Sequence, residues 1–290
     1  MTLSLIVNPA AGGGRAGRAL AGVQAALRGL GLEHHAELTS DLDHGRELAR
    51  AATAAGETAV AFGGDGLVAA VAGALKHTHG VLGVLPGGRG NDFVRTLGIP
   101  LEPGAACAVL ATGVVQALDL GEANGHTFIG IASCGFDSDA NRIANRTRLV
   151  RGNLVYAYGA LRALAAWRPA DFTVEFDGGA RRSVPGYTVA AANSKLYGGG
   201  MQRAPDASLQ DGLLDVVIVA DTPKHRFLRL LPTVFKGDHV RLQNVEVLRG
   251  ATVRIGASRP FTMYADGDPI AELPVTVRTL PGAVRVIVPR

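Results

Sequence analysis

Hydrophobic positions along the first hundred residues follow two alternating periods. Short unbroken apolar runs occupy residues 3–7, 59–62 and 80–85, which is the length and character of buried strands. Between these runs, apolar residues recur every three or four positions, as they do from Leu20 to Leu30, which is the period of a helix packed on a core. Strands that alternate with helices form βαβ units with a parallel sheet. The pattern therefore predicts an α/β unit in this part of the chain.

The same two periods place the other elements of this unit. A further strand is predicted at 33–39, and helices are predicted at 44–55, 68–75, 93–98 and 105–112. In the first of these helices, the residues expected to face the core are Leu48, Ala51, Ala52 and Ala55.

From residue 114 onward the pattern changes to short strands with alternating polarity. Strands are predicted at 114–120 and 125–133, and one long helix is predicted from Leu149 to Trp167. Further short strands are predicted at 172–176, 187–192, 213–219, 245–248, 252–255, 261–265, 274–279 and 284–288. Short strands separated by Gly and Asp turns are typical of an antiparallel sandwich.

The change of pattern near Gly121–Gly125 predicts two domains. We expect an α/β domain at 1–122 and a β-sandwich domain at 123–282. The order of elements alone does not decide whether the last strand, 283–290, completes the first domain or the second.

Composition favours a protein that folds around a large core without disulfides. The chain has 290 residues, of which 47% are hydrophobic and 5% aromatic, so Val, Leu, Ala and Ile must fill the interior. The two cysteines, Cys107 and Cys134, have no metal-type spacing, and Cys134 reads as a small core residue. Residues 1–8 lack the basic region of a signal peptide, and no apolar run approaches the roughly 18 residues of a membrane span. We expect a soluble cytoplasmic protein.

The positive charge of the chain is concentrated in one segment. The net charge is +4, but residues 141–182 alone contain eight arginines and three acids. This segment is either a solvated helix face or a contact for an anionic membrane surface. Trp167, Tyr156 and Tyr158 lie in the same segment and are either core residues or part of that contact.

Glycine-rich turns follow three of the predicted strands. Asn8 to Gly14, Gly63 to Gly66 and Pro86 to Asp92 contain these turns, and the last two each include a carboxylate, Asp65 and Asp92. Backbone N–H groups of such turns bind anions, and ligands of parallel sheets lie beyond the carboxyl ends of the strands. No Gly-Lys-Ser/Thr closes the first turn, so it is not a Walker A loop. The pattern indicates a phosphate and metal site, and hence a nucleotide-dependent kinase.

The ordered set of motifs is more specific than any one turn. The set comprises Asn8-Pro9-Ala10-Ala11-Gly12, Gly63-Gly64-Asp65-Gly66, Leu82-Gly83-Val84-Leu85-Pro86-Gly87-Gly88, Asn91-Asp92-Phe93, Gly98-Ile99-Pro100, Asp119-Leu120-Gly121, Gly198-Gly199-Gly200-Met201, Ala204-Pro205-Asp206, Asp211-Gly212-Leu213-Leu214-Asp215 and Ala265-Asp266-Gly267-Asp268-Pro269. Over essentially its whole length, the chain resembles the bacterial diacylglycerol kinase and lipid kinase family, whose catalytic domain is shared with sphingosine and ceramide kinases. The resemblance implies a phosphofructokinase-like α/β domain followed by a β-sandwich, and transfer of phosphate from ATP to a lipid hydroxyl, with diacylglycerol as the default acceptor.

The resemblance also assigns site residues. It implies nucleotide contacts from Asn8, Pro9, Ala10, Ala11, Gly12, Thr39, Gly63, Gly64, Asp65 and Gly66, to which Arg89 and Asn91 of the second turn are added. A catalytic Mg²⁺ would be held by Asp65, Asp92 and Asp119, each expected at a strand end or turn, directly or through water. A structural Mg²⁺ would be held by the carboxylate of Asp211 and the carbonyls of Ser208 and Leu213. The general base is expected at Asp268, where the family usually has glutamate, with Asp266 as the alternative.

The expected partners are ATP and a membrane lipid. The resemblance implies transient contact with the inner face of the membrane and no nucleic acid, and it leaves a homodimer open. Two departures from the family pattern favour other activities. Leu67, Ala69 and Ala70 stand where Thr, Asn and Glu are usual, and Arg89 replaces a threonine. Arg89 can bind phosphate in its place, but a catalytically impaired nucleotide- or lipid-binding homologue is the main alternative. An NAD kinase is a weaker one, because the Asn8-Pro9 and Asn91-Asp92-Phe93 turns match the lipid kinases better.

Overall fold

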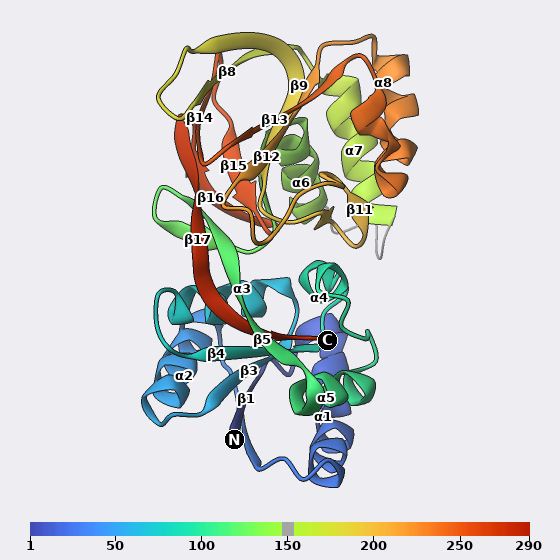
Figure 1. The fold of residues 1–290 in the computed structure, drawn as a ribbon. Coiled ribbons are helices and arrows are strands. Elements are labelled where there is room, and N and C mark those ends of the chain that lie inside the picture. Colours follow the sequence, from blue (N-terminus) through green and yellow to red (C-terminus); the bar gives the residue numbers. More distant parts are fainter. Residues whose placement is uncertain (147–153) are drawn as a thin grey trace.

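The computed structural model describes residues 1–146 and 154–290 and arranges them as two units, one above the other in Figure 1. Residues 149–153 of the predicted long helix lie outside the described part of the chain.

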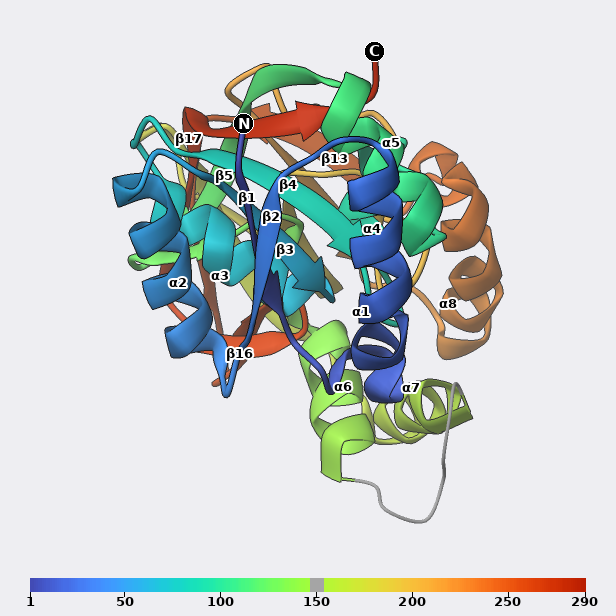
Figure 2. The ribbon, with the colours of Figure 1, turned by 90° about the horizontal axis from the view of Figure 1, so that it is seen from below.

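The N-terminal unit is built on a four-stranded parallel sheet. The order of its strands is β2-β1-β3-β4, and all three pairings are parallel. The strands are β1 (Leu3–Val7), β2 (His34–Leu38), β3 (Thr58–Gly63) and β4 (Val81–Pro86). The helices are α1 (Ala11–Gly29), α2 (Leu42–Ala54), α3 (Asp65–Leu75), α4 (Asp92–Thr96) and α5 (Pro103–Thr112). Seen from below, α2 and α3 lie on one side of these strands and α1 and α5 on the other (Figure 2). This is the α/β architecture that the apolar periods predict.

The inward face of α2 differs from the expected one. Ala51 and Ala55 are exposed, and the buried residues of the helix are Gly45, Ala49 and Ala52. A Cβ added at Gly45 would lie 2.9 Å from Leu67 Cδ1 of α3, so the glycine lets the two helices pack closely. The helix has alanines on both its buried and its exposed sides, so the alanine positions alone do not show which side faces inward.

The C-terminal unit is mainly antiparallel. Its strands are β5 (Val114–Ala123), β6 (His126–Phe128), β7 (Ile131–Gly135), β8 (Ala170–Phe176), β9 (Arg182–Ala192), β10 (Leu196–Tyr197), β11 (Met201–Gln202), β12 (Leu214–Ala220), β13 (Val245–Gly250), β14 (Thr252–Ala257), β15 (Thr262–Ala265), β16 (Asp268–Glu272) and β17 (Val275–Val288). Its helices are α6 (Phe136–Arg146), α7 (Leu154–Ala166) and α8 (Lys224–Leu230), followed by the 3₁₀ turns η1 (Leu231–Lys236) and η2 (Asp238–Arg241). No helix in the described ranges is long and apolar enough to cross a bilayer.

Several elements of this unit were not predicted. They are the helices α6 and α8, the strands β10, β11 and β16, and the 3₁₀ turns η1 and η2. The sequence of α6 is mostly polar, and the helix begins directly after β7 at Gly135, whose φ of 98° turns the chain away from the sheet. Trp167 is 4% exposed and stacks on Tyr187 with ring centroids 5.4 Å apart, so it is a core residue. The side chain of Tyr156 lies outside the described part, whereas Tyr158 is exposed.

The last two predicted strands form one continuous strand that joins the two units. β17 pairs antiparallel with β5 from Val277 opposite Ala123 to Val288 opposite Val114, with a register shift between Leu280 and Val284. Near its end β17 also pairs parallel with β4, so the final residues do extend the N-terminal sheet. In Figure 1 the β5–β17 ribbon runs from the upper unit into the lower one.

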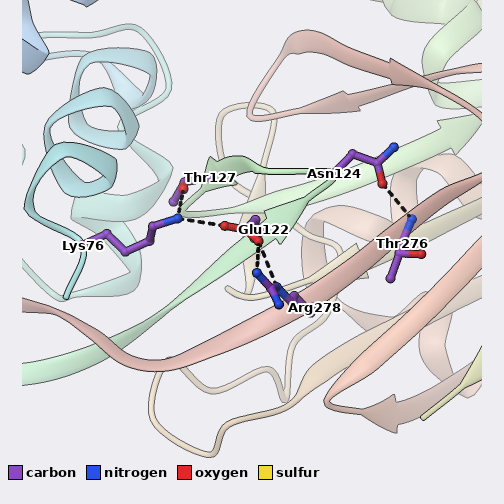
Figure 3. A network of polar contacts seen from close by, with 6 residues as sticks. All are labelled: Lys76, Glu122, Asn124, Thr127, Thr276 and Arg278. Atoms are coloured by element: carbon purple, nitrogen blue, oxygen red, sulfur yellow. Dashed lines mark hydrogen bonds and ion pairs between the residues drawn. The ribbon is translucent and has the colours of Figure 1, made fainter. Parts of the chain in front are cut away.

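Glu122 fixes this ribbon to helix α3. Its carboxylate accepts hydrogen bonds from Lys76 Nζ at 2.8 Å and from Arg278 Nε at 2.9 Å (Figure 3). Lys76 directly follows α3, and Arg278 lies on β17. These contacts, that from Lys76 first, hold the pKa of Glu122 below its usual range. The ion pairs therefore couple the ribbon to the helix whose other end carries Asp65.

We expect Glu122→Gln to lower the free energy of unfolding by about 1–3 kcal/mol at neutral pH, because a largely buried charged acceptor with two cationic partners is lost. Since the folded pKa is lowered, the contribution is fully present above the usual value of 4.5 and decreases as pH falls through the folded pKa. Urea unfolding at several pH values measures this loss.

The matched control is Glu246→Gln, because Glu246 pairs with Arg182 on the surface, where such pairs contribute at most about 1 kcal/mol. Equal losses in the two variants at neutral pH would contradict the special role of Glu122.

Candidate active site

The glycine turns after β3 and β4 pack backbone against backbone. Gly87 N donates to Gly63 O at 2.7 Å. A Cβ added at Gly88 would lie 2.5 Å from Gly64 Cα, and one added at Gly87 would lie 3.1 Å from Gly63 Cα. No larger residue fits this contact without moving a main chain. The glycines thus bring two strand ends together, as the sequence predicts.

The turn after β1 joins the same edge of the sheet. Asn8 Oδ1 accepts a hydrogen bond from Ala10 N at 3.1 Å, which fixes the start of the turn. Gly12, Gly13 and Gly14 then have φ values of 61°, 72° and 85°, and a Cβ on Gly12 would lie 2.5 Å from Gly87 O. Consecutive glycines in this conformation expose N–H groups suited to an anion. Thr39 N donates to Val7 O, so the end of β2 reaches this edge as well.

Two residues of the second turn have different environments. Asn91 is 5% exposed, and its side chain accepts from Gly88 N at 2.8 Å and donates to Gly88 O at 3.2 Å. Its amide is therefore used to hold the turn. Arg89 is exposed, so its guanidinium is available to a ligand.

Asp65 begins α3 and fixes the second turn. Its Oδ1 accepts a hydrogen bond from Phe93 N at 3.1 Å, and its Oδ2 would lie 3.2 Å from a Cβ added at Gly90. A carboxylate in the first turn of a helix is favoured by the helix dipole. Asp65 therefore lies where the turns after β3 and β4 meet.

Asp92 lies beside Asp65 and contacts the other unit. Its Oδ2 accepts a hydrogen bond from Gly199 N at 2.8 Å, in the loop between β10 and β11. Its Oδ1 is buried and has no hydrogen-bond partner among the described residues. Burial raises the pKa of Asp92, the Gly199 N–H opposes that rise, and the charge of Asp65 adds to it. The candidate site therefore lies between the two units.

Asp266 occupies the hairpin turn between β15 and β16. Its φ of 49° and the φ of 98° at Gly267 are the left-handed conformations that a two-residue hairpin requires. Its carboxylate accepts three backbone hydrogen bonds, from Ile129 N at 2.9 Å, Gly130 N at 2.9 Å and Ile131 N at 3.2 Å.

The carboxylate of Asp266 has a strongly raised pKa. Burial raises it to about 7, although the three amides favour the charged form, and the charge of Asp65 adds to the rise. The residue as a whole is half-buried because its backbone forms the turn, whereas its carboxylate faces inward onto the amides. Asp65 and Asp266 are thus close enough to interact across the two units.

Asp268 differs from Asp266 in having a free side chain. It lies opposite Ala265 at the base of the hairpin, is exposed, and makes no side-chain hydrogen bond or ion pair within the described part of the chain. Of the two candidates for a general base, Asp268 is the one whose carboxylate accepts no hydrogen bond within the described part of the chain, whereas Asp266 accepts three.

Asp119 does not lie at a strand end, so that expectation is wrong. It is 3% exposed inside β5, which continues to Ala123. Its carboxylate accepts hydrogen bonds from Gly212 N at 2.8 Å and Gly282 N at 2.7 Å. One oxygen holds the 209–212 turn and the other accepts from Gly282 of β17, and a role at the catalytic metal stays a prediction.

The proposed structural metal segment is a turn closed by its own side chains. Ser208 Oγ accepts from Gln210 N at 3.2 Å, and Asp211 Oδ1 accepts from Leu213 N at 3.1 Å. Asp211 is exposed, and the turn is anchored through Asp119. A Mg²⁺ ion at Ser208, Asp211 and Leu213 remains a prediction.

The residues around Asp65 and Asp92 fit a divalent cation. In residues 1–146 and 154–290, no three His, Cys, Asp or Glu side chains form a complete metal cage. Magnesium is usually bound by one or two carboxylates, with water and substrate phosphates as the other ligands. The unpartnered Oδ1 of Asp92, next to a second carboxylate, has the chemistry that such an ion requires.

Two residues near the site were not predicted to take part. Asn193 is fully buried, and its Nδ2 donates to Asp119 O and Ile129 O at 3.0 and 3.1 Å. Asn193 directly follows the apolar strand β9, as Asn8 directly follows β1. This shared position is the feature of the sequence by which Asn193 could have been found. Gly199 belongs to the quoted Gly-Gly-Gly-Met motif, but nothing local to that motif indicates its contact with Asp92.

Leu67 has a structural role in this chain. It is 2% exposed, and its Cδ2 lies 2.8 Å from the position of a Cβ on Gly63. The leucine thus fills the space beneath the glycine turn, where a hydroxyl-bearing residue was expected.

Comparison with known proteins gives the same domain pattern. Residues 2–123 match the family model described as diacylglycerol kinase catalytic domain, and residues 130–288 match the YegS C-terminal NAD kinase beta sandwich-like domain. The chain is 36% identical to a diacylglycerol kinase of Mycobacterium tuberculosis, over 99% of this chain and 95% of that protein.

A second similar sequence and a similar solved structure agree with this result. The chain is 33% identical to a Pseudomonas aeruginosa protein named "Probable lipid kinase YegS-like", over 91% of this chain and 88% of that protein. The structure of a diacylglycerol kinase from Bacillus anthracis superposes with a TM-score of 0.77 at 22% identity, over 99% of this chain and 96% of that one, which supports the fold alone. The chain therefore belongs to the bacterial diacylglycerol kinase and YegS-like family of ATP-dependent lipid kinases.

Proposed function

We propose that the chain transfers the γ-phosphate of ATP to the free hydroxyl of a diacylglycerol while in transient contact with the inner face of the cytoplasmic membrane. The observation that carries this proposal is the pair Asp65 and Asp92, with an unpartnered carboxylate oxygen, opposite the Asp266–Asp268 turn of the other unit. The names of the relatives support the acceptor class.

The backbone and cationic groups of the N-terminal unit supply phosphate binding in this proposal. The turns at Gly12–Gly14 and Gly63–Gly66 lie at the common strand edge and would offer backbone N–H groups to phosphate, and Arg89 adds an exposed guanidinium. Asp65 and Asp92 would hold Mg²⁺, which neutralises phosphate charge during phosphoryl transfer. Protein positioning and fixed charge provide most of the catalysis in such reactions.

The C-terminal unit supplies the proton acceptor. Asp268 removes the proton of the lipid hydroxyl because its carboxylate makes no hydrogen bond within the described part of the chain, whereas the carboxylate of Asp266 accepts three from backbone amides. Asp266 orients the hairpin that carries Asp268.

We expect Asp65→Asn to reduce phosphate transfer on the order of 10²-fold or more, because a metal-binding charge is lost at the phosphates. Transfer of radiolabelled phosphate from ATP to a panel of diacylglycerol, sphingoid and glycerol lipids measures the effect. Asp43→Asn on the exposed side of α2 is the control and should keep full activity. Wild-type protein that labels no lipid of the panel would refute the proposed function.

Single substitutions of the two hairpin aspartates should affect turnover and stability differently. Asp268→Asn should lower kcat on the order of 10²-fold and leave Tm unchanged, because the side chain is exposed and unpaired. Asp266→Asn keeps a residue that tolerates positive φ but loses one acceptor oxygen, so it should lower the free energy of unfolding by about 1–3 kcal/mol. Loss of turnover in Asp266→Asn at unchanged Tm, with active Asp268→Asn, would assign the base to Asp266 instead.

A second candidate function is nucleotide or lipid binding without turnover. The observation in its favour is the apolar packing of Leu67 beneath the glycine turn, which leaves no hydroxyl at that position. Calorimetric titration with ATP and Mg²⁺, together with the lipid-labelling assay, distinguishes the two candidates. Lipid turnover excludes the second candidate, and saturable ATP binding without turnover supports it. An NAD kinase activity is excluded if NAD is not phosphorylated in the same assay.

A further inference from the structure

Residues 224–241 anchor a short amphipathic segment on the C-terminal unit. Phe227, Leu230 and Val234 are 2%, 3% and 4% exposed and bury one side of α8 and η1 in the core. On the other side, Leu228 is 44% exposed and Phe235 is 58% exposed. The segment is firmly attached to the core and still presents apolar side chains to solvent.

The polar residues around this apolar pair are almost all basic. The segment contains five lysines and arginines and a single acid: Lys224, Arg226, Arg229, Lys236 and Arg241, with Asp238. Arg226, Arg229 and Lys236 are exposed and form no ion pair within the described ranges. The net charge of these 18 residues thus equals the +4 of the whole chain.

A neighbouring helix continues the same character. Lys224 Nζ donates to Ala165 O at 2.9 Å, which joins the start of α8 to the last turn of α7. On α7, Leu161 is 56% exposed and Arg162 is also exposed. Figure 1 shows α7 and α8 next to each other at the outer side of the upper unit. The apolar and basic character is therefore not confined to one helix.

We propose that the face formed by Arg226, Leu228, Arg229, Phe235 and Lys236, here called the α8 face, docks the protein on a bilayer that contains anionic lipid. Amphipathic helices at membrane interfaces place apolar side chains at the acyl boundary and basic side chains among the headgroups. Each basic residue near an anionic surface strengthens binding about fivefold. The proposal rests on the proposed function, because a long-chain diacylglycerol has to be met at the bilayer.

The charge pattern favours a bilayer over a protein partner. Cores of protein interfaces are depleted of lysine and contain larger contiguous apolar areas. Here the exposed Leu228 and Phe235 are followed in sequence by Arg229 and Lys236, whose charges can stay hydrated among lipid headgroups. The segment also lies outside the predicted arginine-rich segment at 141–182, so it is a separate candidate for membrane contact.

The test is binding of the full chain to phosphatidylcholine vesicles with and without phosphatidylglycerol, measured by flotation. Wild type should bind the anionic vesicles preferentially. Arg226→Ala/Arg229→Ala should weaken that binding about 25-fold, and Leu228→Ser/Phe235→Ser should weaken it as well. Matched controls are Arg28→Ala/Arg50→Ala on exposed positions of α1 and α2, and Leu30→Ser/Leu38→Ser, whose side chains are 43% and 54% exposed. The controls should bind like wild type.

A second measurement separates this proposal from the kinase function. Both α8-face variants should lose activity on long-chain diacylglycerol in anionic vesicles and keep activity on a short-chain diacylglycerol below its micellar concentration. If wild type phosphorylates neither substrate, the kinase function fails, while flotation still reports on the surface.

Three outcomes overturn the proposal. They are equal binding of wild type to neutral and anionic vesicles, binding of the α8-face variants as tight as wild type, and conversion of a dimer to a monomer by these substitutions in sedimentation. The last result would show that the face contacts a second copy of the chain.

Discussion

Burial of carboxylates where the two units meet is the constraint around which the candidate site is arranged. Burial raises the pKa of Asp92 and of Asp266, and the charge of Asp65 adds to both rises. Such a cluster is tolerated only where donors compensate the buried charge. The compensation comes from Phe93 N at Asp65, from Gly199 N at Asp92, and from three amides at Asp266. A site that gathers negative charge in this way is prepared for a cation with its phosphate ligands.

The paired strands β5 and β17 hold the two halves of this cluster together. Antiparallel pairing along almost the whole of β17 gives the connection between the units many backbone hydrogen bonds, and its last residues extend the N-terminal sheet. Glu122 adds ion pairs that tie the connection to α3, and Asp119 ties it to the 209–212 turn. Because α3 begins at Asp65, the same elements that join the units also set the position of this carboxylate.

Packing explains one of the departures from the family pattern, the leucine at position 67. Leu67 occupies the space between Gly63 and Gly45, so an apolar side chain there stabilises the contact of α3 with α2 and with the glycine turn. Arg89 remains exposed beside the turn and is available to phosphate. The glycine turns are therefore intact, although the two threonine hydroxyls of the family pattern are replaced.

The sequence by itself determined the strands, helices and glycine turns of the N-terminal unit, because apolar period and glycine conformation act over a few residues. It also determined that Asp65 and Asp92 follow neighbouring strands and that the hairpin carries two aspartates. Only the tertiary structure decided that Asp266 is occupied by amides more than a hundred residues away, that Asp119 lies within a strand, and that residues 275–288 are one strand. It also decided which face of α2 is inward. These features depend on contacts between distant segments, and such contacts leave no period in the local sequence.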